Sequence, residues 1–276
     1  MDYTDYDDYT LKKLQELELM MLKDFIKICD ENNLEYFMYS GSLIGAVRHK
    51  GFIPWDDDID VIMFREDYDK FVEIFKSQKN EKYDLLTAEN TDDYFLLFSK
   101  IVLKGTKFEE WWFDQVNFDL GIFIDIFVLD DAPKNKFSQK IFTRRAHILN
   151  RFISISTLKF SNYPKSTQFI VNTLHLLFKK FNLSPCFFKK KFFNLIKKNN
   201  GSDSVFIVSS WYYNEIYQKT DWTPSVKLQF EDIMVNVPND YDKILTRLYG
   251  DYMQLPPEED RYNHITETLD FGPYSP

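Results

Sequence analysis

The chain has 276 residues, of which 44% are hydrophobic, and its formal net charge is −9. This length and apolar content allow a substantial core and exclude a disordered protein. The two cysteines, Cys29 and Cys186, match neither a disulfide framework nor a zinc site. The acidic N-terminus is unlike a signal peptide, and no apolar run reaches the roughly 18 residues of a transmembrane helix. We therefore expect a cytoplasmic protein.

Hydrophobic periodicity predicts the elements of the first half of the chain. Apolar residues recur every three or four positions from Leu11 to Asn32, as on the buried face of a helix. Aromatic and β-branched runs between turn residues predict strands. The elements expected next are a strand at Tyr36–Tyr39, a short helix entered at Ser42, a loop at Gly51–Trp55, a strand at Ile59–Phe64, a helix at Asp67–Phe75, and strands at Tyr83–Thr87, Phe95–Leu103, Phe108–Phe113 and Gly121–Leu129.

The second half opens with a helical pattern and returns to strands. Together the elements predict an α+β fold, a mixed β-sheet core with flanking helices and a basic helical insertion. We expect three regions: 1–132 as the catalytic core, 133–202 as the insertion, and 203–276 completing the core and the active site. The elements expected here are helices at Ile141–Ile153, Ser166–Phe181 and Ser184–Lys198, strands at Val205–Ser209 and Phe230–Val237, a helix at Asp240–Tyr249, and an irregular tail from Pro256.

The charge is divided unevenly along the chain. From Ala132 to Ser202 there is no Asp or Glu but there are 15 Lys and Arg residues, whereas the rest holds all 43 acids and 19 bases. The two later helices of this segment combine Phe and Leu with Lys, a pattern that suits an anionic membrane surface. We therefore expect peripheral docking on the inner face of the membrane. The alternatives are packing on the core and docking against the acidic remainder. Nucleic acid is not an expected partner, because no nucleic-acid-binding module accompanies the charge.

Four carboxylates lie within the five residues Asp56–Asp60. If the strand begins near Asp58, then Asp58 and Asp60 point to the same face, about 7 Å apart, because side chains alternate along a strand. Such a pair can share a divalent cation, and Mg²⁺ prefers hard oxygen ligands together with substrate phosphates. A solvated acidic loop is the alternative. It is disfavoured because apolar residues flank the acids on both sides.

Two further features complete a plan for a phosphate and metal site. Gly41-Ser42 at a strand-to-helix junction offers free backbone N–H groups and a hydroxyl, which suit phosphate oxygens. Asp125 lies inside the apolar run Gly121–Leu129, where a lone charge is costly unless it is paired or bound to a metal. The sequence therefore predicts a metal-dependent phosphotransferase with Asp125 as the third acid.

The stretch Gly41–Val61, with its Gly-Ser turn and its run Trp55-Asp56-Asp57-Asp58-Ile59-Asp60, closely resembles the signature of the LicD family. These proteins are phosphocholine transferases of bacterial surface glycans, related to fukutin-type proteins and similar in fold to nucleotidyltransferases. The resemblance spans nearly the whole chain apart from 133–200. It continues at Lys100, Ile124–Phe127, Phe230-Glu231, Tyr249–Met253, Pro256–Glu259, Arg261 and His264.

The resemblance implies a nucleotidyltransferase-like fold and the metal-dependent transfer of phosphocholine, or a similar substituted phosphate, from a CDP-linked donor such as CDP-choline. The acceptor is a hydroxyl of a cell-surface glycan such as teichoic acid or lipopolysaccharide, and CMP is released. A lipid-linked glycan acceptor fits the expected membrane docking. Asp58, Asp60 and Asp125 are expected to bind Mg²⁺, or Mn²⁺ in its place, and to act in catalysis.

Other residues are expected around these acids. Gly41, Ser42, Arg48 and Lys100 are candidates for binding the donor phosphates; the alternative for Arg48 is to complement a helix C-terminus. If the head group is choline, its quaternary ammonium needs aromatic contacts, although core packing is the commoner use of such residues. Candidates for the outer shell or the substrate are Asp56, Asp57, His49, Trp222, Arg261 and His264, and the aromatic candidates are Trp111, Trp112, Trp211, Tyr212, Tyr213 and Trp222.

Two other functions remain open. One is a nucleotidyltransferase that transfers NMP to a small acceptor. The other is a non-catalytic binding protein that has kept the fold, against which the joint presence of Asp58, Asp60 and Asp125 argues.

Overall fold

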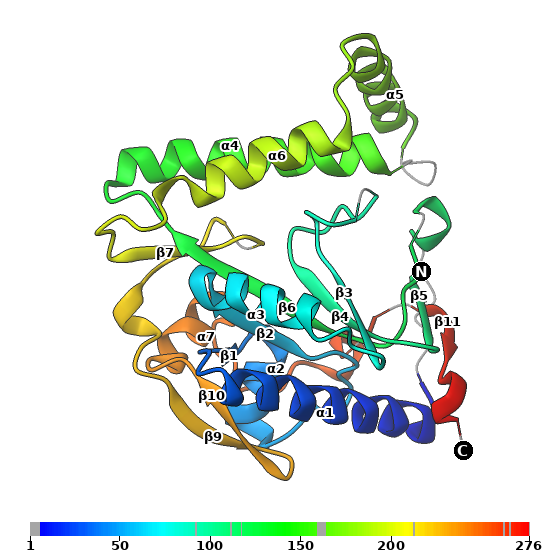
Figure 1. Cartoon of the computed structure of the whole chain (residues 1–276), viewed down its shortest axis with the longest axis vertical. Coiled ribbons are helices and arrows are strands. Elements are labelled where there is room, and N and C mark those ends of the chain that lie inside the picture. Colours follow the sequence, from blue (N-terminus) through cyan, green and yellow to red (C-terminus); the bar gives the residue numbers. More distant parts are fainter. Residues whose placement is uncertain are drawn as a thin grey trace.

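The computed structural model has an α+β fold, as the sequence predicts: a mixed sheet flanked by helices (Figure 1). The structure describes residues 6–91, 93–110, 112–116, 118–158, 164–211, 213–261, 263–264 and 266–275. The described part contains no helix that is long and apolar enough to cross a membrane.

The centre of the fold is a seven-stranded sheet in the order β1-β2-β6-β4-β3, with β7 paired to β6 and β8 paired to β7. β2 and β6 are parallel neighbours, and the other pairs are antiparallel. Every residue of β6 is buried, and this strand pairs with β2, β4 and β7. The strands are β1 Phe37–Met38, β2 Asp60–Phe64, β3 Tyr83–Leu86, β4 Ser99–Leu103, β6 Phe123–Asp131, β7 Phe206–Ser209 and β8 Ile216–Gln218.

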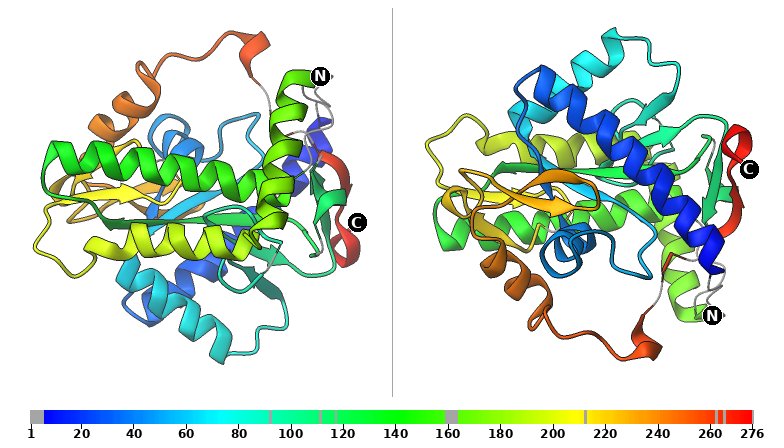
Figure 2. Two further views of the ribbon diagram at one scale, coloured as in Figure 1. Left: turned by 90° about the horizontal axis from the view of Figure 1, so that it is seen from above. Right: turned by 90° about the horizontal axis from the view of Figure 1, so that it is seen from below.

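The two faces of the sheet have different coverings, because side chains alternate along β2 and β6. Val61 and Met63 of β2 lie in the main core with residues of α1 (Asp8–Glu31) and α3 (Arg65–Ser77). Figure 2, right, shows α1 lying across this face. The rings of Phe25 on α1 and Phe71 on α3 lie 5.2 Å apart and join the two helices.

The opposite face carries a second, smaller buried cluster. Ile62 and Phe127 pack there with Trp222 and with Ile244 of α7 (Tyr241–Tyr249). Asp60 and Asp125 have the same parity along their strands as Ile62 and Phe127. The two acids therefore share this face of the sheet.

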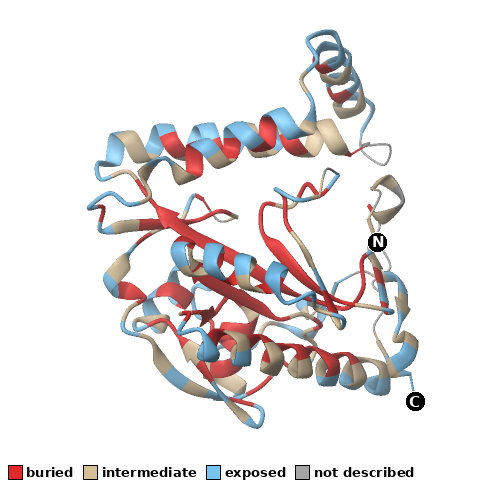
Figure 3. Cartoon of the chain, viewed as in Figure 1, coloured by how far each residue is buried: buried red, intermediate tan, exposed pale blue. Residues whose placement is uncertain are grey.

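The basic segment forms α4 (Lys136–Thr157), α5 (Lys165–Lys180) and α6 (Pro185–Ile196), with α4 and α6 side by side and α5 standing beyond them (Figures 1 and 2). Phe152, Phe178 and Phe188, one from each helix, have ring centroids 4.8–5.4 Å apart. Lys189 of α6 donates to the carbonyl of Thr91 at 2.9 Å, which attaches the segment to the body. Figure 3 shows that the sheet is mostly buried whereas much of α5 is exposed.

The structure corrects several of the predicted elements. The run expected as one strand at Phe230–Val237 is a hairpin of β9 (Val226–Phe230) and β10 (Ile233–Val237), turning at Glu231 and Asp232. The tail after Pro256 is not wholly irregular, because β11 (Thr266–Asp270) pairs with β5 (Lys107–Glu110). A strand whose partner lies far away in the sequence has a weak local signal, and this explains why β11 was missed.

Candidate active site

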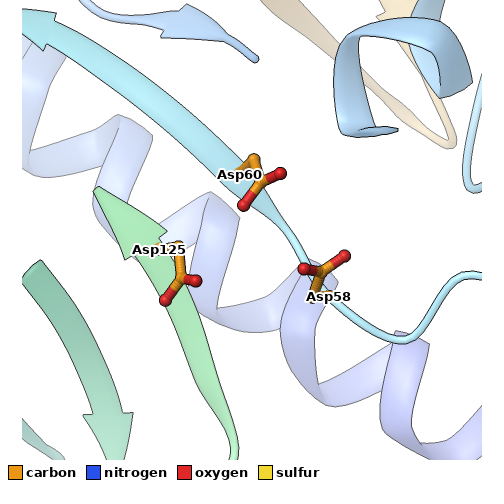
Figure 4. Close-up of side chains that lie close together, drawn as sticks. All are labelled: Asp58, Asp60 and Asp125. Atoms are coloured by element: carbon orange, nitrogen blue, oxygen red, sulfur yellow. The ribbon is translucent and has the colours of Figure 1, made fainter. Parts of the chain in front are cut away.

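Three carboxylates meet where β2 and β6 run side by side (Figure 4). Asp60 is the first residue of β2, Asp125 is its direct partner on β6, and Asp58 lies in the loop before β2. One carboxylate oxygen from each residue lies within 4.8 Å of the other two. The strand begins at Asp60, two residues later than the parity argument assumed. The expected convergence of the three acids is nevertheless present.

Local hydrogen bonds hold this loop in place. The hydroxyl of Ser42 accepts from the backbone N–H of Asp60 at 2.9 Å, and the N–H of Asp125 donates to the carbonyl of Ile59 at 2.8 Å. A Cβ at Gly41 would lie 3.0 Å from an oxygen of Asp56, so the backbone passes close to this carboxylate. The short helix α2 (Ser40–Ile44) begins at Ser40 and continues as a π-helix over Gly45–His49. The Ser42 hydroxyl, a candidate for binding phosphate, supports the strand that carries Asp60 through this hydrogen bond.

Burial and mutual repulsion disfavour the charged forms of these acids. Burial raises the pKa of Asp58 and Asp60, and the neighbouring Asp58 and Asp125 raise that of Asp60 further. Burial, followed by Asp58 and Asp57, raises the pKa of Asp56. Burial raises the pKa of Asp125 to about 7, although Lys100 opposes this shift. A bound cation would relieve the repulsion, so the cluster fits a hard divalent metal.

Lys100 lies in the same row of the sheet as the acids. It is the cross-strand partner of Asp125 on β4, and its Nζ donates to Asp125 Oδ1 at 2.7 Å. The ammonium also lies 3.1 Å from the centroid of the Phe123 ring, and both partners of the ion pair are buried. The sequence assigned Lys100 to the donor phosphates. In the structure its ammonium pairs with Asp125 and compensates the charge of that carboxylate, and its role toward phosphate stays a prediction.

The C-terminal residues close the acidic site from another side. His264 donates its backbone N–H to both oxygens of Asp57, at 2.9 and 3.0 Å, and its Nδ1 lies 3.0 Å from Asp57 Oδ1. Its Nε2 lies 3.8 Å from Asp58 Oδ2. The His264 side chain is 44% exposed; partial desolvation opposes the charged ring, but Asp58 and Asp57 raise the pKa of His264 well above its usual range. The pairing of β11 with β5, where Thr266 lies opposite Glu110, brings His264 to this position.

Arg48 and His49 hold the C-terminal segment instead of pointing freely into the site. Arg48 Nη1 donates to the carbonyl of Tyr252 at 2.5 Å, and its Nε donates to His49 Nε2 at 2.9 Å. This contact differs from the expected phosphate role of Arg48. Arg261 lies over the ring of Trp55, 5.0 Å from its centroid. Burial and the nearby Arg261 both lower the pKa of Arg48, so two cations lie near each other beside the acidic loop.

Trp222 is not available to a substrate. Its side chain has no exposed surface, and its ring packs edge-to-face on Phe37 and Tyr217. It is the centre of the smaller cluster, which corrects its assignment to the site. Of the other aromatic candidates, Trp112 and Tyr213 are also buried, and Trp211 packs on Phe98. Trp111 and Tyr212 lie outside the described residues.

Glu18 is a residue of this region that the sequence reasoning missed. It lies on α1, is 1% exposed, and its Oε2 has no hydrogen-bond partner among the described residues. Burial, followed by Asp58, Asp57 and Asp56, raises its pKa well above the usual range. The available signal was its spacing, because position 18 falls between Leu14 and Met21 on the buried face of the helix.

A cavity of about 380 Å³ lies at the far ends of β2 and β6, away from the acids. The two cations of its wall are paired: Arg65 with the buried Asp130 at 2.8 Å, and Lys219 with Asp131 at 2.6 Å. Asn200 donates to Asp130 and accepts from the N–H of Asp131. This network is internally satisfied and ties the end of the sheet together. The acidic site is therefore the better candidate for chemistry.

A mixed sheet that brings an Asp-x-Asp pair and a third Asp together beside a Gly-Ser turn defines a nucleotidyltransferase-like phosphotransferase. Residues 33–166 match the family model described as LicD/FKTN/FKRP, nucleotidyltransferase domain. The chain is 33% identical over 266 residues to the Lipopolysaccharide cholinephosphotransferase LicD of Haemophilus influenzae, covering 92% of this chain and 96% of that protein. An uncharacterized protein of Rickettsia typhi is 29% identical over 182 residues, covering 62% and 54% of the two chains. The chain belongs to the LicD family.

Proposed function

We propose that the protein transfers phosphocholine, or a similar substituted phosphate, from a CDP-linked donor such as CDP-choline to a hydroxyl of a cell-surface glycan. The convergence of Asp58, Asp60 and Asp125 carries this proposal, because a pyrophosphate donor needs a cation beside it. The similarity to a lipopolysaccharide cholinephosphotransferase over nearly the whole of both chains supports phosphocholine as the group and lipopolysaccharide as the type of acceptor.

The donor set fits Mg²⁺, or Mn²⁺ in its place. Asp58, Asp60 and Asp125 would hold the ion through carboxylate oxygens. When bound, the ion would neutralise the donor phosphates and stabilise charge that develops during displacement. Burial of the carboxylates and their raised pKa values are the features of this chain that call for such a cation.

The protein's own groups orient the reactants and receive a proton. In the proposed reaction, the acceptor oxygen forms a bond to the phosphorus of the substituted phosphate, and the bond from this phosphorus to the bridging oxygen breaks. CMP leaves with that oxygen and the bond's electrons. Asp125 takes the acceptor proton, and Lys100, at 2.7 Å, holds this carboxylate in place. His264 anchors Asp57, and the cations Arg48 and Arg261 lie near the acidic loop, where they favour an anionic donor.

A donor screen tests this function. The purified chain is incubated with Mg²⁺ and CDP-choline, CDP-ribitol or CDP-glycerol, and CMP release is measured in the presence of a glycan acceptor. We expect release of CMP from CDP-choline, with the phosphocholine group recovered on the acceptor. Recovery of CMP attached to the acceptor would identify an NMP transferase instead. Turnover by Asp58→Ala equal to that of the wild type would refute the metal-site assignment. Location in the cytoplasm, with access to a lipid-linked acceptor, is part of the same proposal.

A further inference from the structure

The exposed apolar side chains of the protein are concentrated on the basic helices. Among the described residues, nine of the fifteen large hydrophobic side chains that are exposed lie between positions 137 and 187, on α4 to α6 and the turn that joins α5 to α6. Exposed apolar groups scattered singly are normal, whereas a concentration on one segment indicates an interaction surface. They are Phe137, Ile141, Ile148, Phe169, Ile170, Leu176, Leu177, Phe181 and Phe187.

α5 has apolar groups on two opposite faces. Val171 and Phe178 are buried, and Phe178 packs on Phe152 of α4 and Phe188 of α6. Phe169 is 73% exposed and Leu176 is 70% exposed. At 100° per residue, positions 169 and 176 lie within about 20° of each other, on the side of the helix opposite Phe178. One face of α5 therefore anchors the helix, and the other is left to solvent.

The charges around this face have one sign. Lys165, Lys179 and Lys180 lie on α5, and no acid occurs between Ala132 and Ser202. In the described part of the chain, no ion pair involves these three lysines or Arg144 and Arg151 of α4. A second copy of the chain placed face to face would bring like charges together. An anionic lipid surface can bury the apolar side chains and pair its head groups with the cations.

We propose that the exposed face of α5, centred on Phe169, Ile170, Leu176 and Leu177 and flanked by Lys179 and Lys180, docks the protein on an anionic membrane. The apolar side chains enter the boundary between head groups and acyl chains, and the lysines contact the anionic head groups. Figure 1 shows α5 at the end of the molecule that projects from the sheet, where a flat surface can reach it. The inference concerns attachment and does not rest on the identity of the donor.

Vesicle co-sedimentation of the full chain tests the proposal. We expect binding to vesicles of phosphatidylcholine mixed with phosphatidylglycerol, weaker binding in high salt, and little binding to phosphatidylcholine alone. The variant Lys179→Gln/Lys180→Gln should bind about 25-fold more weakly, since each lysine near the surface contributes roughly 1 kcal/mol. The matched control Lys76→Gln/Lys79→Gln, on and just after α3, should bind as the wild type does.

The apolar face is tested separately. Phe169→Ser/Leu176→Ser should lower vesicle binding at least about tenfold, because two large apolar side chains no longer leave water. Met234→Ser, which alters an exposed apolar residue on β10, is the control. Both α5 variants should keep wild-type CMP release with a water-soluble acceptor, which separates this test from that of the proposed function. Binding that ignores lipid charge, or an oligomer abolished by Phe169→Ser/Leu176→Ser without any vesicle binding, would overturn the proposal.

Discussion

The acidic end of the sheet and the basic helices are two regions in which the fold does not neutralise its own charge. In the first, Asp56, Asp58, Asp60 and Asp125 crowd together, and among the described residues Lys100 is the one basic side chain that forms an ion pair with Asp125. In the second, lysines and arginines stand at the surface with no acid in the segment. By contrast, Arg65 and Asp130 form a closed pair. The two regions therefore differ in what can neutralise them. A buried cluster of carboxylates can be neutralised by a small cation, whereas exposed lysines and arginines can be neutralised by an anionic surface.

Removing one carboxylate should have the largest effect on activity. We expect Asp60→Asn to lower CMP release on the order of 1,000-fold, because a ligand of the proposed cation is lost at the centre of the cluster. The same variant should melt at a higher temperature than the wild type in metal-free buffer, because burial and its neighbours raise the pKa of Asp60. Asp84→Asn, at an exposed acid on β3, is the control. CMP release with Mg²⁺ equal to that of the wild type, or a lower melting temperature than the wild type in metal-free buffer, would contradict the assignment.

Breaking the buried ion pair should have the next largest effect. Lys100→Met leaves Asp125 buried without its partner, so the free energy of unfolding should fall by about 3–5 kcal/mol. Urea denaturation measures this change. Lys104→Met is the matched control, since its pair with Asp84 is solvent-exposed and should contribute less than about 1 kcal/mol. Equal losses of unfolding free energy in the two variants would show that the buried pair stabilises the fold no more than the exposed pair does.

Loss of the contact between the His264 ring and Asp57 should lower activity less than the loss of Asp60 does. His264→Gln keeps the backbone N–H bonds to Asp57 but loses the ring, so activity should fall about 10- to 100-fold, as for residues that support metal ligands. Initial rates of CMP release at several Mg²⁺ concentrations measure this change. His147→Gln, at a histidine on α4, controls for the loss of an imidazole elsewhere. An unchanged dependence on Mg²⁺ would argue that His264 acts on the substrate instead.

The smallest expected effect is a pH-dependent change in melting temperature. The pKa of Asp125 is raised to about 7 from 3.8, so its stabilising contribution is present below pH 3.8 and is lost as pH rises toward 7. Glu18, Asp56, Asp58 and Asp60 shift in the same direction. Metal-free protein should therefore melt a few degrees lower at pH 7 than at pH 5, and Mg²⁺ should reverse this. A melting temperature that rises over this range without metal would contradict the geometry.

The sequence located the acids but not all of their partners. Asp58 and Asp60 could be found because four acids cluster within five residues between apolar runs, although Asp58 precedes the strand. Asp125 could be found because a charge inside an apolar run is conspicuous. The partner of Lys100 depends on which strand lies beside β4, and the contact of Arg48 with Tyr252 joins residues 204 positions apart. Neither contact can be read from the residues that neighbour it in the sequence. The burial of Trp222 and Glu18 likewise depends on tertiary packing, and the division into three regions remains a prediction.

The hydrogen bonds between Asp57 and His264 join residues 207 positions apart, which affects when the site can form during synthesis in the cell. The N-terminal part of a chain leaves the ribosome first and can begin to fold there. The acidic loop and β2 are made first, and His264 follows 207 residues after Asp57. The acidic loop therefore lacks this contact while the intervening residues are being made. The contact of His264 with the acidic loop must therefore form after β11 has left the ribosome.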